Sequence, residues 1–223
     1  MRQKLTIVLM LLMLPAYNCL AQFTVTEKHY GDSLLQVLST TKADTTKART
    51  NFLLGVHWSE YSLDKAKQFI QTGRSLGGNN TFLQALSYFY EGRVYEKYDL
   101  EKGNQCYATA IRLFDKVASK ESTLFKGRTV FNYSINLYKQ VKDKASMELL
   151  LNQGIPTALK GNDVDLASKC YIMVAKMFLN TKQYDKAISY FGKATDILEI
   201  TAPKSNILYT AYIRAAFANC AIG

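Results

Sequence analysis

The chain contains few of the residues that break helices or build metal and redox sites. Three prolines, two histidines, one tryptophan and four cysteines occur among 223 residues. Runs in which β-branched residues alternate with polar ones, which are typical of strands, are also missing. With 48% hydrophobic residues the chain is too apolar for general disorder. These features favour a folded, all-α protein.

Several motifs that carry common enzyme chemistry are missing as well. The sequence has no G-x-x-x-x-G-K-[ST], G-x-G-x-x-G or H-E-x-x-H motif. Of the two histidines, His29 and His57, the second lies in an expected helix between Val56 and Trp58, where a packed histidine is commoner than a catalytic one. We therefore expect no catalytic residue, no metal site and no cofactor, and the chain is not interpreted as an enzyme.

Residues 1–21 predict a signal peptide. Two basic residues precede an apolar run over 5–14, and about ten residues are too few to span a bilayer. Small residues before the cut favour cleavage after Ala21, which would export the mature chain to the periplasm. A lipid anchor on Cys19 is the alternative, but Tyr-Asn at 17–18 does not match the small residues of a lipobox, which disfavours it.

Basic residues outnumber acidic ones. The chain has 28 Lys and Arg against 18 Asp and Glu, a formal charge of +10. Cleavage would remove Arg2 and Lys4 and no acidic residue, which leaves +8. The lysines are scattered rather than clustered, so a solvated basic surface is the favoured interpretation. Export makes nucleic acid a poor partner, whereas acidic peptides, anionic glycans and a membrane surface stay open.

Three cysteines would remain after cleavage: Cys106, Cys170 and Cys220. No C-x-x-C pair is present, and each cysteine has an apolar helical context. A free cysteine in such a context packs as a small hydrophobic residue, so we expect buried thiols. One disulfide stays open, but the sequence does not choose its pair.

The most informative stretch is 166–197. Large apolar residues, a polar turn and small residues recur there at the spacing of two helices that pack closely, because small residues let the axes approach and large ones fill the groove beside them. The stretch resembles a tetratricopeptide (TPR) repeat. The residues in question are Tyr171, Val174, Ala175, Phe178, Tyr184, Ala187, Phe191 and Ala194.

Weaker copies of this pattern occupy 45–76, 81–117 and 121–162, and 207–222 matches the first helix of a fifth repeat. The resemblance implies an all-α, right-handed superhelical solenoid of helix–turn–helix repeats. The second-helix small residues are 37, 42 and 42 residues apart, more than the roughly 34 of a TPR unit, which predicts lengthened helices. These small residues are Ala66, Gly103, Ala145 and Ala187.

Local patterns add detail to the repeats. Ser62 and Asp99 occupy equivalent positions and predict helix N-caps. In the third and weakest repeat, Pro156 should end or kink the second helix. Its first helix is expected to place Phe131, Ile135 and Tyr138 on the packed side.

The N-terminal segment 22–44 should begin extended and continue as a short capping helix with Leu34, Leu35 and Leu38 on one face. The expected organisation is therefore a signal peptide over 1–21, this segment, and a TPR-like array over 45–223. The array would hold about four repeats and the first helix of a fifth.

The TPR resemblance also implies a concave groove, lined by the first helices of successive repeats, that holds peptides. Transferred residue by residue, the peptide-binding candidates are Phe89, Arg93, Asn132, Asn136 and Lys176. The pattern matches the family's carboxylate-binding groove only in part. The alternative is that the polar members are ordinary solvated positions of helices.

The resulting functional prediction is an exported, non-catalytic scaffold that binds a protein or peptide. The alternative is the periplasmic sensory region of a two-component histidine kinase or membrane-bound transcription regulator, cut before its membrane and output domains. The segment 207–222 has a single charged residue, Arg214. Its apolar character predicts self-association or continuation of the array through this segment.

Overall fold

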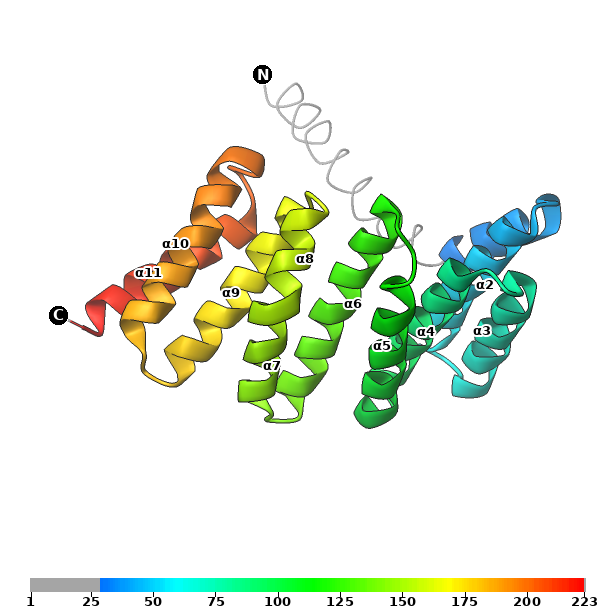
Figure 1. Ribbon diagram of the computed structural model, residues 1–223, viewed down its shortest axis with the longest axis horizontal. Helices are drawn as coiled ribbons and strands as arrows, with labels where there is room; N and C mark the ends of the chain where they lie inside the picture. The colour runs from blue at the N-terminus through cyan, green and yellow to red at the C-terminus, as the bar shows by residue number, and fades with distance from the viewer. Residues whose placement is uncertain (1–28, 223) are drawn as a thin grey trace, which may run out of the picture.

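The computed structural model describes residues 29–222, and helices are its regular elements. About ten helices follow one another across the molecule and pack mainly on their sequence neighbours, an all-α arrangement consistent with a helical repeat (Figure 1). The predicted signal peptide, its cleavage after Ala21, the lipidation site Cys19 and the extended start of 22–44 lie outside the described residues. Residues 29–40 are helical, and the further helices are α2 Asp44–Trp58, α3 Leu63–Gly77, α4 Thr81–Tyr95, α5 Leu100–Phe114, α6 Lys120–Lys139, α7 Asp143–Leu149, the π-helical η1 Leu150–Gly154, α8 Ile155–Lys160, α9 Val164–Asn180, α10 Tyr184–Thr201 and α11 Asn206–Cys220.

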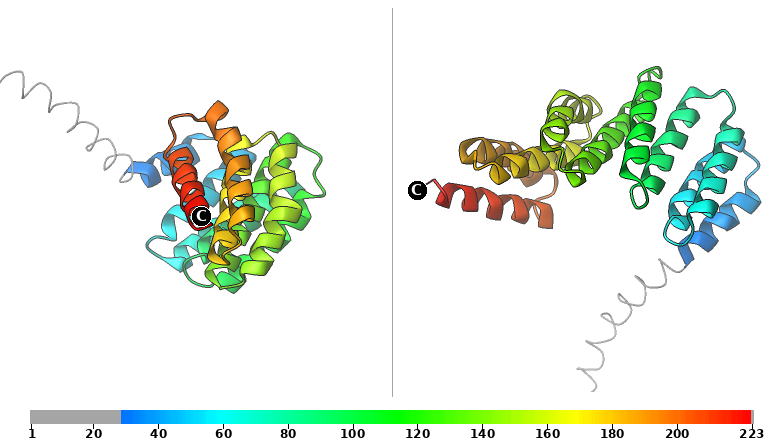
Figure 2. Two further views of the ribbon diagram at one scale, coloured as in Figure 1. Left: turned by 90° about the vertical axis from the view of Figure 1, so that its left-hand side faces the viewer. Right: turned by 90° about the horizontal axis from the view of Figure 1, so that it is seen from below.

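The helices form sequential hairpins. We call α2, α4, α6, α9 and α11 the first helices and α3, α5, α7 with η1 and α8, and α10 the second helices. Each of the first helices α2, α4, α6 and α9 packs on the second helix that follows it. The last first helix, α11, packs on α10, which therefore contacts both α9 and α11. The hairpins succeed one another from α2 at one end to α11 at the other (Figures 1 and 2).

Glycine permits the closest helix contacts in the first two hairpins. A Cβ added to Gly92 would lie 2.5 Å from Cε1 of Tyr107, which is fully buried on α5. A Cβ on Gly55 would lie 2.7 Å from Cδ1 of Ile70 on α3. The predicted role of the small residues is therefore confirmed here, because no larger side chain fits at these crossings.

The third hairpin has a different register from the one that the sequence predicted. Ser146, not Ala145, is buried at the crossing, and its hydroxyl donates to the backbone oxygen of Ser134 at 2.8 Å. Ala145 is exposed, and Ile135 is only half-buried beside the fully buried Ser134. The small pair is therefore Ser134 and Ser146, one residue away from the predicted Ile135 and Ala145 on each helix.

The predicted N-caps are confirmed. The side chain of Ser62 accepts a hydrogen bond from the backbone N–H of Lys65 at 3.3 Å, and Asp99 accepts from that of Lys102 at 3.0 Å. This bond from Lys102 is also the main reason why the pKa of Asp99 is lowered. Each cap satisfies a helix N–H that has no partner within its helix.

Pro156 interrupts its helix as predicted, in the form of a π-helical turn. The backbone stays in the right-handed helical region at Gly154 and Ile155, and the π-turn η1 ends directly before α8. Proline has no N–H and its ring crowds the carbonyl four residues earlier, so the wider turn is a physical response to Pro156. The interrupted second helix still buries Leu150 and Ala158.

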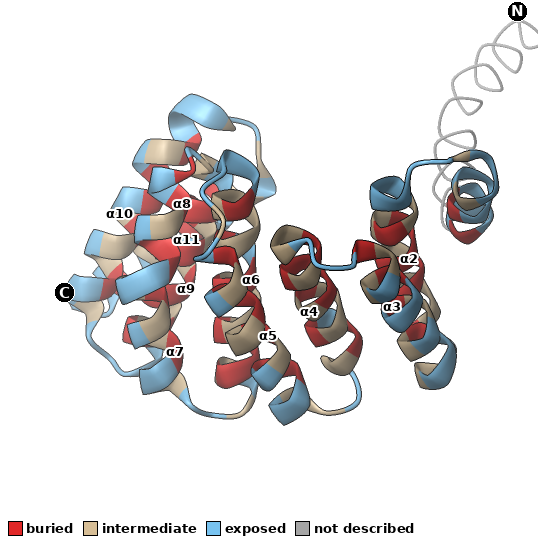
Figure 3. Ribbon diagram, turned by 45° about the vertical axis from the view of Figure 1, so that its right-hand side comes forward, coloured by how far each residue is buried: buried red, intermediate tan, exposed pale blue. Residues whose placement is uncertain are grey.

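Two hydrophobic clusters form the interior, and the buried residues lie where neighbouring helices meet (Figure 3). The N-terminal cluster is built mainly from α2 to α5, and the C-terminal cluster from α7 to α11 with η1. The helix over 29–40 adds only a small part. Leu34 is buried and Leu38 half-buried, but Leu35 is 43% exposed, contrary to the expectation that all three would face the core.

Candidate functional site

A pocket of about 350 Å³ opens between the first helices α6, α9 and α11. Helices α9 and α11 both pack on α10, the latter after the loop at 202–205, and α6 packs on α9 (Figure 2). The accessible wall of the pocket is mostly apolar. Its lining consists of Phe131 from α6, Lys169, Ile172, Met173 and Lys176 from α9, and Asn206, Ile207, Thr210 and Arg214 from α11.

The pocket lining contains three cations and no acidic residue. Lys169 forms an ion pair with Asp165 on its own helix at 2.5 Å. Within residues 29–222, Lys176 and Arg214 have no ion pair. An apolar wall next to two unpaired cations attracts a ligand that is both apolar and negatively charged.

Of the residues predicted to bind a peptide, Lys176 lies in this pocket. Arg93 is exposed on α4 and belongs to the other half of the molecule. Phe89 is buried in the N-terminal cluster, where it meets Tyr90 edge-on with ring centroids 4.9 Å apart. A ligand on the surface would therefore meet Tyr90 before Phe89.

The two predicted asparagines also lie away from the pocket. Asn136 is fully buried between α6 and α5, where its amide nitrogen is 3.2 Å from the place a Cβ on Gly103 would take. Its two polar side-chain atoms have no hydrogen-bond partner among the described residues. Asn132 is half-buried near Tyr107. The structure therefore does not bring the five predicted residues into one site.

The shifted register of the third hairpin explains why the two asparagines lie away from the pocket. With Ser134 aligned to Ala175, the positions equivalent to Ile172 and Lys176 are Phe131 and Ile135 rather than Asn132 and Asn136. Phe131 does line the pocket beside Ile172. The serine pair Ser134 and Ser146 was the sequence signal that could have set this register.

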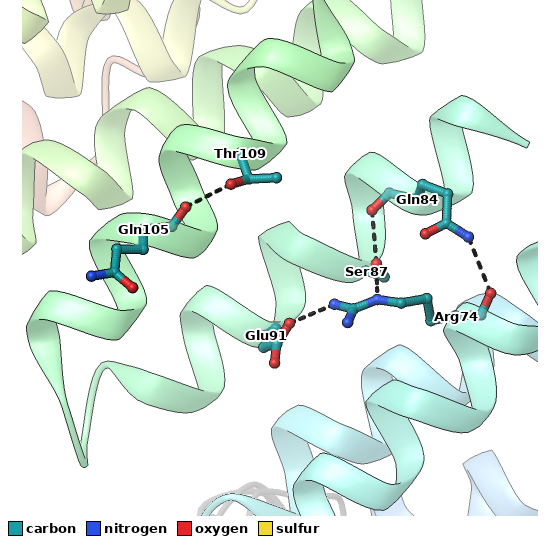
Figure 4. A network of polar contacts seen from close by, with 6 residues as sticks. All are labelled: Arg74, Gln84, Ser87, Glu91, Gln105 and Thr109. Atoms are coloured by element: carbon teal, nitrogen blue, oxygen red, sulfur yellow. Dashed lines mark hydrogen bonds and ion pairs between the residues drawn. The ribbon is translucent and has the colours of Figure 1, made fainter.

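A second polar cluster joins α3 to α4 and is satisfied internally (Figure 4). Arg74 donates to Ser87 Oγ at 2.9 Å and to Glu91 at 2.5 Å, while its guanidinium lies 4.3 Å from the ring centroid of Tyr88. Gln84 in turn donates to the backbone oxygen of Arg74 at 3.2 Å. Because the charged groups already have partners, we interpret this cluster as a structural contact that holds the first hairpin, α2 and α3, against the second, α4 and α5.

The three cysteines among residues 29–222, Cys106, Cys170 and Cys220, are free thiols. Burial raises the pKa of the Cys170 thiol to about 12 and is the main reason that the pKa of Cys106 is also raised to about 12. Cys170 is buried and Cys106 half-buried, but Cys220 is exposed on α11, so the expectation of three buried thiols was wrong at that position.

The outer side of α11 exposes large apolar side chains. Ile213 is 70% and Phe217 62% exposed, with Tyr209 and Tyr212 also exposed. No helix between residues 29 and 222 is both long and apolar enough to cross a membrane. Over the same residues, no group of three or more His, Cys, Asp or Glu side chains is arranged to hold a metal ion.

The fold defines an all-α protein whose roughly ten helices are arranged in sequential pairs, with a pocket on its first helices. No protein-family model matches the chain, and no curated protein has a significantly similar sequence.

Proposed function

We propose that the chain is an exported, non-catalytic scaffold of TPR type that binds a protein or peptide along its first helices. The observation that carries this proposal is the pocket between α6, α9 and α11. Its position agrees with the groove that the TPR resemblance implies. Export is supported by the N-terminal sequence pattern of 1–21.

The recurrence of the hairpins supports the TPR part of the proposal. The small residues at the crossings of the first helices, Gly55, Gly92, Ser134 and Ala175, are separated by 37, 42 and 41 residues. Each pairs with a small residue on the following second helix. Unrelated helical hairpins would not be expected to repeat this contact in the same place.

The chemistry of the pocket suits one part of a peptide. A volume of about 350 Å³ is at the lower end of the roughly 300–1,000 Å³ of ligand pockets. Phe131, Ile172 and Ile207 can contact an apolar side chain. Asn206 and Thr210 offer amide and hydroxyl groups that can hydrogen-bond a peptide backbone.

The exposed apolar side of α11 supports a further contact. Self-association, or continuation of the helical array through 207–222, would cover Ile213 and Phe217, which are exposed. Either contact would extend the scaffold beyond the pocket.

A selection from random displayed 12-residue peptides tests the proposal. Thr210→Trp should fill the pocket from an exposed position, and Thr201→Trp is a matched control. Both threonines are exposed and each hydroxyl donates to the backbone oxygen four residues earlier at 2.8 Å. The full chain should enrich a common peptide motif, Thr210→Trp should lose it, and Thr201→Trp should keep it. No enrichment by the wild-type chain, or equal enrichment by Thr210→Trp, would contradict the proposal.

A further inference from the structure

The ligand chemistry of the pocket can be narrowed further, on the basis of the proposed peptide-binding function. We infer that the pocket between α6, α9 and α11 selects a peptide segment in which a bulky apolar side chain is flanked by carboxylates. The apolar side chain enters the pocket, and the carboxylates contact Lys176 and Arg214.

The charges at the pocket favour an acidic ligand. Lys176 belongs to α9 and Arg214 to α11, so the two cations reach the pocket from different helices. Among the described residues neither is neutralised by an ion pair, and no acidic side chain lines the pocket. A ligand with carboxylates on either side of its apolar group can contact both cations, whereas a cationic ligand would be repelled.

The apolar wall of the pocket favours a bulky apolar side chain. Phe131, Ile172 and Ile207 come from three helices and surround one volume, so a single bulky side chain can contact all of them. Met173 also lines the pocket, and its flexible thioether can adapt to the shape of that side chain. A glycine at the central position of the ligand would leave this wall uncovered.

The open shape of the pocket favours a peptide over a small organic anion. The pocket is open to solvent along the first helices rather than enclosed, and Asn206 and Thr210 are exposed at its α11 side. A peptide backbone can continue past both residues and hydrogen-bond them. A small carboxylate would use the wall and one cation only.

Fluorescence anisotropy with defined peptides tests the inference. The probe is a fluorescein-labelled Gly-Ser host peptide with Glu-Phe-Glu at its centre, and Lys-Phe-Lys and Glu-Gly-Glu versions are the comparisons. We expect the full chain to bind the Glu-Phe-Glu peptide at least tenfold more tightly than either other peptide. Binding should weaken as salt is added, because the cations are solvent-accessible.

Charge-reversal variants provide the matched comparison. Lys176→Glu combined with Arg214→Glu should invert the preference, so that Lys-Phe-Lys binds more tightly than Glu-Phe-Glu. Lys160→Glu changes an exposed lysine on α8 outside the pocket and should leave the preference unchanged. Circular dichroism of each variant checks that the helical fold is kept.

Equal affinity for the Glu-Phe-Glu and Lys-Phe-Lys peptides, or an unchanged preference in the folded double variant, would overturn the inference. If 3-phenylpropionate at the same concentration as the peptide displaces the Glu-Phe-Glu peptide, the pocket is a small-anion site and the inference is overturned. If the random selection yields a pocket-dependent motif without acidic residues, the scaffold proposal stands and only this inference falls. If the selection yields no motif and the Glu-Phe-Glu peptide does not bind, both fall.

Discussion

The two N-terminal hairpins and the two C-terminal hairpins differ in helix length and in the small residues at their helix crossings. The helices α2 to α5 are each 15 residues long, whereas α6, α9 and α10 have 20, 17 and 18 residues. Glycine forms the first-helix contact in the N-terminal hairpins, and serine or alanine replaces it in the C-terminal hairpins. The lengthened helices predicted from the sequence spacing are therefore confined to the C-terminal half.

The turns differ in the same way. From first-helix to second-helix small residue, the N-terminal hairpins span 11 positions and the C-terminal hairpins span 12. The additional residue has a left-handed backbone, with φ of 59° at Val141 and 57° at Lys182. The following residues, Lys142 and Gln183, do not cap their helices with a side chain, unlike Ser62.

These differences show why the pocket lies in the C-terminal half. The first helices α2 and α4 pack directly on each other, whereas α9 and α11 hardly touch. In the N-terminal half, the buried rings of Phe52 and Phe89 both contact the ring of Tyr90, with ring centroids 5.9 and 4.9 Å apart. Aromatic side chains therefore pack between α2 and α4, whereas the pocket lies between α6, α9 and α11.

The largest expected effect comes from breaking a close contact in the N-terminal half. Gly92→Ala should destabilise the protein by about 2–3 kcal/mol, because its Cβ would meet the buried Tyr107 ring. The matched variant Gly192→Ala in α10, where a Cβ meets no atom within 4 Å, should stabilise by about 0.5–1 kcal/mol. Urea unfolding followed by circular dichroism measures both. Similar free-energy changes for the two variants would show that the close approach at Gly92 is not needed.

An added N-cap should make the C-terminal turns more like the N-terminal ones. Asn162 has a left-handed backbone, and Asp163 after it has φ −92° and ψ 78°. The side chain of Asp163 caps α9 by accepting a hydrogen bond from the backbone N–H of Leu166 at 3.1 Å. Gln183 has nearly the same backbone angles, φ −88° and ψ 67°, but no cap. Gln183→Asp should therefore stabilise by about 1 kcal/mol in urea unfolding.

The reverse change, Ser62→Ala, should destabilise by about the same 1 kcal/mol, since it removes an existing cap. Loss of stability in Gln183→Asp would show that the turn geometry of Asp163 does not transfer to α10.

The smallest expected effect concerns Val141. A β-branched residue is strained at positive φ, and this valine is 86% exposed, so its side chain gains little from packing. Val141→Asn should raise stability by a few tenths to about 1 kcal/mol, because asparagine tolerates the left-handed region better. Val37→Asn, at an exposed helical position, should not stabilise. Equal thermal midpoints for Val141→Asn and the wild-type chain would contradict strain at this turn.

The sequence predicted those features that depend on a few neighbouring residues. The caps Ser62 and Asp99 and the interruption at Pro156 each follow from chemistry within one helical turn. The four hairpins were also predictable, because large and small residues recur at helix spacing.

The register of the third hairpin was missed, although the serine pair Ser134 and Ser146 was a signal for it. Ala145 and Ser146 are adjacent small residues, and only the partner helix decides which one is buried. The additional turn residue is Val141, whose type gives no indication of a left-handed backbone. Because of this shift, the sequence predicted Asn132 instead of Phe131, which lines the pocket, and the buried Asn136 instead of Ile135.

Nuclear magnetic resonance of the ¹⁵N-labelled chain, titrated with the Glu-Phe-Glu peptide, tests the central claim most directly. A pocket between the first helices of the C-terminal half predicts that backbone amide shifts change around Phe131, Ile172 and Ile207, on α6, α9 and α11. Changes confined to the second helices α3, α5 and α10, or to the N-terminal half, would contradict the account.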